Sequence, residues 1–404
     1  MSLSPELQPV NKGPGDAPRP GRTKDNFLVF GAPLIEQAEI DEVVAVLRSG
    51  WVGSGPRVAR FEEAFRAYKG WGHAVAVSSC TAALHVSMLA AGIKPGDEVI
   101  TTPFSFVASA NCILFVGAKP VFADIDPKTL NIDLAKAADA ITTKTRAIVA
   151  VETFGHPGGM VELEQLAQKN ELVLIEDSCE GFGGRVGGRR IGSFGRASVF
   201  AFYPNKQITT GEGGMIVTDD DTFAATCRSL RNQGRDGMAW LAHQRLGYNY
   251  RLSEIAAALG VSQCSRLDEM LTERRRVAHA YIDRLMTSRF LIMPTLSDET
   301  FMSWFVFVVR LNDLFTPADR DQIIQELRAE GIGSSNYFPP IHLQPYMADA
   351  FGYKPGDYPV CEHVSARTLA LPFFNTLTTR QINRVCDTLE SILEHTLMKE
   401  SPRF

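Results

Sequence analysis

Apolar positions recur with two different periods along the chain after residue 27, and segments of the two kinds alternate. Short runs of consecutive or alternating apolar residues predict strands at 73–77, 98–102, 119–125, 146–151, 172–175 and 215–218. Apolar residues spaced three and four apart predict helices at 81–91, 107–116, 161–169 and 223–231. This alternation predicts an α/β fold with a mainly parallel sheet sandwiched by helices.

Longer amphipathic segments flank the alternating region. They predict helices at 35–48 and 58–68 before it, and at 252–264 and 267–284 after it. The remaining segments, an extended one at 301–311 and helices at 317–330 and 379–398, predict a separate α+β block. We therefore predict a large domain over 27–265 and a smaller C-terminal domain over 266–404.

The first 26 residues carry five prolines among polar residues and have no apolar core. This composition predicts a disordered tail over 1–26, and it is unlike a signal peptide or a membrane helix. No later stretch approaches the roughly 20 apolar residues that cross a bilayer. We therefore expect no membrane association.

Composition narrows the function classes further. The net charge of −5 over 404 residues argues against non-specific binding to nucleic acid. The seven cysteines form no CxxC pair and no Cys/His spacing suited to zinc, so we predict no metal site. An odd number of cysteines in a long chain indicates reduced thiols and a cytoplasmic location.

Polar residues follow several predicted strands, at the edge where parallel sheets bind ligands. Asp177 ends the apolar run at 172–175, where a buried carboxylate is costly unless it is paired. A protonated pyridine nitrogen would be a suitable partner. The alternative is that Asp177 caps the next turn.

Lys206 lies in a segment with little helical pattern, just before Gly211, Gly213 and Gly214. A lysine on a tight turn together with a buried carboxylate suits a Schiff-base enzyme that uses pyridoxal phosphate. The amine holds the cofactor aldehyde, and the anion keeps its ring nitrogen protonated. The alternative is a surface lysine beside a plain hairpin turn.

Two further motifs are ambiguous by themselves. The Ser-Ser-Cys-Thr-Ala-Ala sequence at 78–83 joins a strand to a helix, where free backbone N–H groups could bind a phosphate or Ser79 could simply cap the helix. The Phe-Ser-Phe sequence at 104–106 could stack an aromatic ring on a planar cofactor or pack it into the core.

The order of these motifs resembles the DegT/StrS family of sugar aminotransferases. The resemblance runs from about Phe30 to Leu389 and includes the Trp-Val-Gly-Ser-Gly-Pro sequence at 51–56, Phe-Tyr-Pro-Asn-Lys at 202–206 and Gly-Tyr-Asn-Tyr-Arg at 247–251. It implies the fold-type I architecture of pyridoxal-phosphate aminotransferases. Lys206 would then hold the cofactor and move the proton, while Asp177 would face the pyridine nitrogen and Phe106 would stack on the ring.

The resemblance also implies the remaining site residues. The cofactor phosphate would be bound by Ser79, Thr81 and Ala82. Asn249 or Arg251 would reach it from the partner subunit, which requires a homodimer with shared active sites. Tyr337 and His342 would lie near the sugar. Glu180 departs from the family pattern, which commonly has Gln or His beside the phenolic oxygen of the cofactor.

The implied reaction moves an amino group from an amino acid, by analogy glutamate, to a keto sugar on a nucleoside diphosphate. Such a reaction belongs to amino-sugar, polysaccharide or glycoconjugate biosynthesis. One alternative acceptor is a keto-cyclitol. A different alternative is a catalytically silent regulatory protein that binds pyridoxal phosphate. Lys206 argues against the dehydrating relatives, in which His replaces the lysine.

Overall fold

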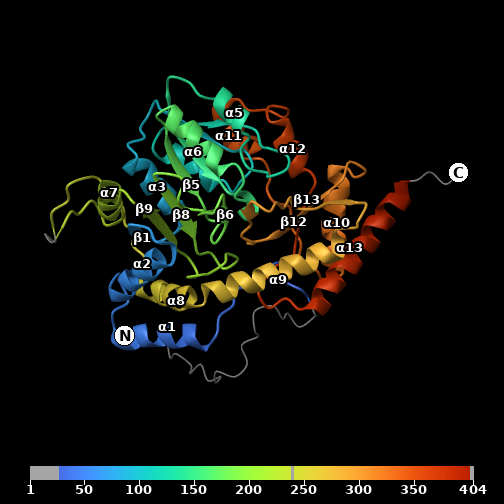
Figure 1. Cartoon of the computed structure of the whole chain (residues 1–404), viewed down its shortest axis with the longest axis horizontal. Helices are drawn as coiled ribbons and strands as arrows, with labels where there is room; N and C mark the ends of the chain where they lie inside the picture. Colours follow the sequence, from blue (N-terminus) through green and yellow to red (C-terminus); the bar gives the residue numbers. More distant parts are fainter. Residues whose placement is uncertain (1–26, 238–240, 401–404) are drawn as a thin grey trace, which may run out of the picture.

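The computed structural model describes residues 27–237 and 241–400, so the predicted tail over 1–26 lies outside the described residues. Its centre is a seven-stranded sheet (Figure 1). Only β9 runs against its neighbours, and the other pairs are parallel, as predicted. In spatial order the strands are β1 (His73–Val77), β9 (Gly214–Thr218), β8 (Ala197–Ala201), β5 (Val173–Asp177), β4 (Thr145–Val151), β2 (Glu98–Thr101) and β3 (Lys119–Phe122).

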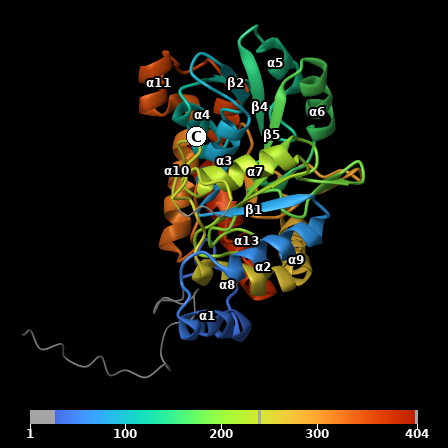
Figure 2. The same cartoon turned by 90° about the vertical axis from the view of Figure 1, so that its left-hand side faces the viewer.

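Successive residues of the strands point to opposite faces, and both faces are buried. Val75 and Val77 of β1 join one hydrophobic cluster, whereas Ala74 and Ala76 join another. Figure 2 shows helices on either side of β4 and β5. One face is covered by α3 (Cys80–Ala90), α4 (Ala108–Phe115) and α7 (Asp221–Arg231). The other is covered by α2 (Pro56–Lys69), α5 (Leu134–Asp139), α6 (Met160–Lys169) and α8 (Glu254–Ser265).

A smaller antiparallel sheet forms beyond α8. The long helix α9 (Leu267–Leu285) runs from the large sheet toward it (Figure 1). This sheet orders β10 (Leu291–Ile292), β12 (Phe307–Leu311) and β13 (Thr368–Leu371), and α10 (Pro317–Ala329) and α13 (Thr379–Glu400) pack against it. Its hydrophobic cluster also includes Phe104 and Phe154 of the large sheet's loops. The domain boundary between residues 265 and 266 therefore stays a prediction.

Shorter elements connect these layers. The N-terminal helix α1 (Gln37–Ser49) packs on α8. A third sheet pairs β6 (Arg185–Val186), β7 (Arg189–Arg190) and β11 (Thr300–Phe301). The remaining elements are η1 (Thr153–Gly155), η2 (Ile341–Leu343), α11 (Pro345–Phe351) and α12 (Pro359–Ser365). None of the helices in the described part of the chain has the length and apolarity that a membrane crossing requires.

Candidate active site

Asp177 and Lys206 approach the same edge of the sheet from neighbouring strands. Asp177 is the last residue of β5, and Lys206 lies in the turn that follows β8, which pairs with β5 in parallel. Asp177 is 2% exposed, and the Lys206 side chain is 11% exposed. Lys206 is therefore not a surface lysine. Within the described chain Asp177 accepts from the Ser109 hydroxyl and from no backbone N–H of the next turn, so it is not a turn cap.

One oxygen of Asp177 has a partner and the other is free to take one. The Ser109 hydroxyl donates to Asp177 Oδ2 at 2.6 Å, and Ser105 Oγ lies 3.0 Å from Ser109 Oγ. Asp177 Oδ1 is buried and has no hydrogen-bond partner among residues 27–237 and 241–400. A buried acceptor without a donor is costly, so this oxygen fits a protonated ring nitrogen of pyridoxal phosphate.

The Lys206 amine lies between a carboxylate and an aromatic ring. Its Nζ is 3.6 Å from Glu180 Oε1 and 3.8 Å from the centre of the Phe305 ring. Glu180 is 2% exposed, and its Oε2 accepts a hydrogen bond from the Phe154 backbone N–H at 2.8 Å. Glu180 is thus held toward Lys206.

Burial and neighbouring charges act in opposite directions on this pair. Burial raises the pKa of the Glu180 carboxyl, although the Lys206 ammonium opposes part of that rise. Burial alone would lower the pKa of Lys206, but four acidic neighbours, with Cys179 and Glu180 the largest contributors before Cys80 and Asp177, together leave that pKa raised. Without cofactor, Lys206 therefore stays an ammonium at neutral pH.

Arg274, on the buried side of α9, holds the turn that carries Lys206. Its guanidinium donates to the backbone oxygens of Lys206 at 2.7 Å, Asn205 at 3.3 Å and Phe305 at 3.1 Å. Burial lowers the pKa of Arg274 to about 10, so it is still charged at neutral pH. Sequence reasoning missed this residue, although a cation on the apolar stripe of a helix, three residues before Val277, was a usable signal.

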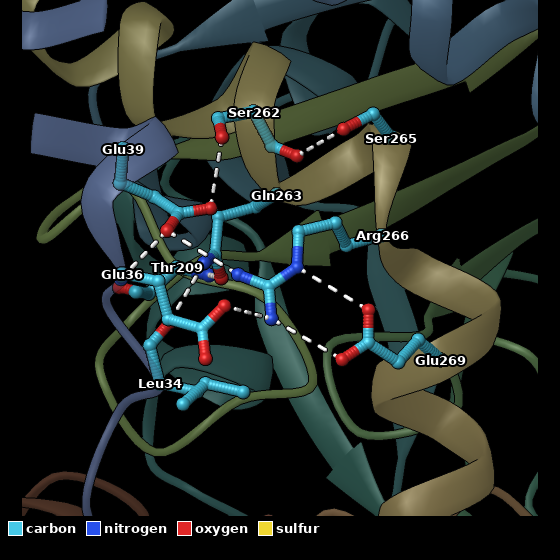
Figure 3. A network of polar contacts seen from close by, with 9 residues as sticks. All are labelled: Leu34, Glu36, Glu39, Thr209, Ser262, Gln263, Ser265, Arg266 and Glu269. Atoms are coloured by element: carbon cyan, nitrogen blue, oxygen red, sulfur yellow. Dashed lines mark hydrogen bonds and ion pairs between the residues drawn. The ribbon is translucent and has the colours of Figure 1, made fainter. Parts of the chain in front are cut away.

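A second polar network fixes the same turn from the side of α1 (Figure 3). The Gln263 side chain accepts from the Thr209 N–H at 3.2 Å and donates to the Leu34 oxygen at 2.9 Å. Close by, Arg266 lies between α8 and α9 and pairs with Glu39 at 3.4 Å and with Glu36 and Glu269. The turn from Lys206 to Thr209 is therefore anchored at both ends.

The motif at 78–83 forms the start of α3. Ser79 is its N-cap and accepts a hydrogen bond from the Ala82 N–H at 3.1 Å, so the capping alternative is confirmed. Thr81 remains partly exposed. A Cβ atom on Gly214 would lie 2.6 Å from the Ser79 oxygen, so the glycine is required for β9 to approach this turn. Phosphate binding at this helix start stays a prediction.

Two of the predicted site residues are aromatic, Phe106 and Tyr337. Phe106 is 60% exposed, so the alternative that its ring packs into the core is wrong. Tyr337 is half-buried, and its ring lies 6.4 Å from that of Phe305, which in turn contacts Lys206. Burial raises the pKa of the Tyr337 phenol. The structure thus places Tyr337 close to Lys206, beside the ring of Phe305.

His342 is fully buried. Its side chain has no exposed surface, its Nε2 lies 3.0 Å from Glu362 Oε1, and its ring lies 4.7 Å from that of Tyr358. Burial lowers the pKa of His342. That His342 lies near the sugar stays a prediction, and the structure shows that its ring is enclosed by neighbouring side chains. The sequence motif around His342 singled out this residue, but a sequence does not determine the orientation of the imidazole ring.

Asn249 and Arg251 lie beside a separate cavity of about 920 Å³. Arg251 Nη1 donates to Asn232 Oδ1 at 3.1 Å, and Asn232 also forms a backbone bridge with Asn249. The backbone of Arg251 also forms an antiparallel bridge with Val77, the last residue of β1. The cavity is lined by four arginines, Arg228, Arg231, Arg235 and Arg251.

A protein-family model matches most of the chain. A model described as the DegT/DnrJ/EryC1/StrS aminotransferase family matches residues 33–390. This chain belongs to that family. The resemblance found from sequence motifs is therefore confirmed, and the chain is a sugar aminotransferase that depends on pyridoxal phosphate.

Three relatives illustrate the match. The chain is 38% identical to the spore coat polysaccharide biosynthesis protein SpsC of Bacillus subtilis, covering 92% of this chain and 98% of that protein. It is 38% identical to GDP-perosamine synthase of Caulobacter vibrioides, covering 91% and 98%. The pyridoxal-phosphate form of the putative sugar aminotransferase Spr1654 from Streptococcus pneumoniae superimposes with a TM-score of 0.87 at 27% identity, covering 92% and 99%. The predicted fold-type I architecture is confirmed by this superposition.

Proposed function

We propose that this aminotransferase moves an amino group from glutamate to a keto sugar carried on a nucleoside diphosphate. The observation that carries the proposal is the pairing of an enclosed amine, Lys206, with the unpartnered carboxylate oxygen of Asp177 at one sheet edge. The nucleotide-linked acceptor is supported by the similarity to GDP-perosamine synthase. The similarity to a spore coat polysaccharide protein supports a role in polysaccharide or glycoconjugate biosynthesis.

The residues present fit the cofactor. Lys206 would hold its aldehyde covalently, Asp177 would accept from its ring nitrogen, and the exposed ring of Phe106 would stack on it. The start of α3, with Ser79, Thr81 and Ala82, would bind the phosphate, since backbone N–H groups and the helix dipole favour an anion there. When bound, pyridoxal phosphate supplies an electron sink for the carbon that exchanges its amino group.

Lys206 then acts as the proton carrier. Its Nζ would take the proton from the α-carbon of the amino donor and deliver it to the carbon of the former cofactor aldehyde, and it would reverse this transfer when the acceptor is aminated. Arg274 keeps this movement short, because it fixes the backbone of residue 206 while the side chain moves. Phe305 covers one side of the amine and limits the access of water to it.

We infer a homodimer with shared active sites, in which Asn249 and Arg251 reach the partner's cofactor phosphate. The arginine-lined cavity of about 920 Å³ supports this arrangement, because its cations suit a phosphate or pyrophosphate. Of these cations, Arg231 is already committed to Glu62 and to the Ala76 oxygen. Tyr337 is the aromatic residue that we place beside the sugar.

A direct test is to screen keto-sugar nucleotides with glutamate and to detect the amino-sugar product by mass spectrometry. We expect a mass change that matches the replacement of a keto oxygen by an amino group, together with 2-oxoglutarate. Free keto-cyclitols form the comparison set. Product from cyclitols alone, or no product and no exchange with any amino donor, would overturn the proposed acceptor.

A further inference from the structure

Two thiols that are far apart in the sequence meet at the proposed cofactor site. Cys80 is the first residue of α3, and Cys179 lies two residues after the end of β5. Cys80 Sγ, Cys179 Sγ and a carboxylate oxygen of Asp177 all lie within 4.8 Å of one another. Sequence spacing alone predicted no metal site, because these three residues form no short motif.

The two thiols of this cluster are among the more exposed ones of the chain. Cys80, Cys179 and Cys264 are partly exposed, whereas the other four thiols are buried. Asp177 is 2% exposed, and its Oδ1 has no donor within the described chain. The cluster therefore combines two reachable thiols with a buried oxygen that lacks a partner.

We propose that the cofactor-free protein binds one thiophilic divalent cation, such as Zn²⁺, through Cys80, Cys179 and Asp177. Zn²⁺ takes thiolate and carboxylate ligands at about 2.3 and 2.0 Å in a tetrahedral arrangement, often with water as the fourth ligand. Such bond lengths place the ligand atoms roughly 3.5–3.8 Å apart. The three atoms lie within 4.8 Å of one another, so they would have to draw together toward that spacing when the cation binds.

The charged groups around the cluster favour a cation. Binding replaces two thiol protons, which leave to solvent, by one cation, and no electron is transferred. Two thiolates and the Asp177 carboxylate bring three negative charges, against two positive charges on the cation and one on Lys206. Glu180 faces Lys206 at 3.6 Å, and its carboxylate would add one further negative charge to this total.

The cation and the cofactor would compete, because the proposed function assigns the same Asp177 carboxylate to pyridoxal phosphate. This competition rests on the proposed function, but affinity of the stripped protein for the cation does not. A thiophilic metal would thus hold the enzyme in a form that cannot load its cofactor until the metal is removed.

The test uses full-length protein stripped of cofactor with hydroxylamine and titrated with Co²⁺ as a spectroscopic substitute for Zn²⁺. We expect one equivalent to produce the near-ultraviolet charge-transfer band of thiolate–cobalt bonds and the visible bands of a tetrahedral site. Zn²⁺ should displace it. Absence of the thiolate band in the wild-type protein would overturn the proposal.

Variants assign the ligands. Cys80→Ser and Cys179→Ser should each weaken Co²⁺ binding by at least about tenfold, the usual effect of losing one strong contact. Cys264→Ser, in α8, is the matched control and should bind as the wild type does. Circular dichroism checks that each variant is folded. Asp177→Asn tests the third proposed ligand while both thiols remain, and it should also weaken Co²⁺ binding. Bands unchanged in both cysteine variants would refute the site.

A final comparison separates this proposal from the proposed function. Protein loaded with pyridoxal phosphate should bind Co²⁺ at least about tenfold more weakly than stripped protein. Equal affinity in both forms would overturn the competition. If Co²⁺ binds through both cysteines but no lysine-linked cofactor can be detected, the metal site stands and the proposed role of Lys206 fails.

Discussion

The Lys206 amine lies 3.6 Å from the Glu180 carboxylate, and both side chains are almost fully enclosed. The family resemblance places Gln or His at position 180, so this chain keeps an additional negative charge beside its amine. Because Glu180 is also fixed by the Phe154 N–H, it cannot easily turn away. The pair therefore controls the proton that Lys206 must lose before it can bond to an aldehyde.

Replacing that charge should change how cofactor loading depends on pH. Only the neutral amine attacks an aldehyde, and the pKa of Lys206 is raised, so the loading rate should increase as the pH rises toward that pKa. Glu180→Gln removes a group that raises this pKa, and the increase should move to lower pH. A change of one pKa unit alters the neutral fraction about tenfold.

The measurement is the growth of the visible absorption band after pyridoxal phosphate is added to stripped protein between about pH 7 and 10, bracketing the range in which a lysine amine titrates. Glu212→Gln is the matched control, because Glu212 is exposed on the loop after Lys206. Identical pH profiles for Glu180→Gln and the wild type would show that Glu180 does not act on the amine.

Lys206→Ala should abolish transamination while leaving the fold intact. Loss of the proton carrier should lower kcat by roughly 10²–10⁴-fold, and loss of the covalent link should remove the visible band of bound cofactor. Lys119→Ala, at a lysine whose side chain is 54% exposed, should leave both unchanged. Substantial turnover by Lys206→Ala would contradict the assignment, provided that circular dichroism shows a folded protein.

Asp177→Asn should reduce the rate more than cofactor affinity, because its charge stabilises the protonated ring rather than the phosphate. We expect kcat to fall at least about tenfold, equivalent to 1.4 kcal/mol of transition-state stabilisation. Ser109→Ala keeps the carboxylate and removes only its 2.6 Å donor, so it should have a smaller effect. Equal turnover numbers for Asp177→Asn and the wild type would count against this role.

Much of the large domain could be predicted because its strands are buried on both faces and read as apolar runs. The strand at 73–77 has the same limits in sequence and structure, and β5 ends at Asp177, two residues beyond the predicted run. The strand β8 was not predicted. It contains Ser198, whose buried hydroxyl donates to Ser178, so its apolar pattern is interrupted.

Some residues of the candidate site could be predicted from the sequence and others could not. Lys206 and Asp177 could be predicted from the order of the motifs, because the residue type itself carries their chemistry. Arg274 and Ser109 were missed, since each acts through a contact with a residue far away in sequence. His342 was assigned from its motif, but ring orientation depends on packing against Glu362, which a single sequence does not reveal.

Arg274→Met should destabilise the turn of Lys206. The methionine fills much of the same volume but leaves the Lys206 and Phe305 oxygens without donors, at a cost of about 1–3 kcal/mol for each buried group. We expect the free energy of unfolding to fall by about 2–4 kcal/mol and cofactor affinity to weaken. Arg275→Met, at the exposed neighbouring position, is the control. Chemical denaturation of both variants checks this, and equal losses would refute the anchoring role.

A last prediction concerns Glu152, which follows β4 and is fully buried. Burial, together with the charges of Glu176 and Asp177, holds the pKa of the Glu152 carboxyl well above its ordinary value of 4.5. The folded state therefore keeps a proton that the unfolded chain has lost. By linkage, stability falls as the pH rises from about 4.5 toward the folded pKa.

Glu152→Gln should remove this loss, because the amide has nearly the same shape and does not titrate. Urea denaturation at several pH values between about 5 and 8 should show a wild-type free energy of unfolding that decreases with pH relative to the variant. Each unit by which the folded pKa exceeds the ordinary value contributes about 1.4 kcal/mol to the difference. Glu299→Gln, at an exposed position, should follow the wild type. If the Glu152→Gln and wild-type curves run parallel throughout, Glu152 is not the group that retains the proton.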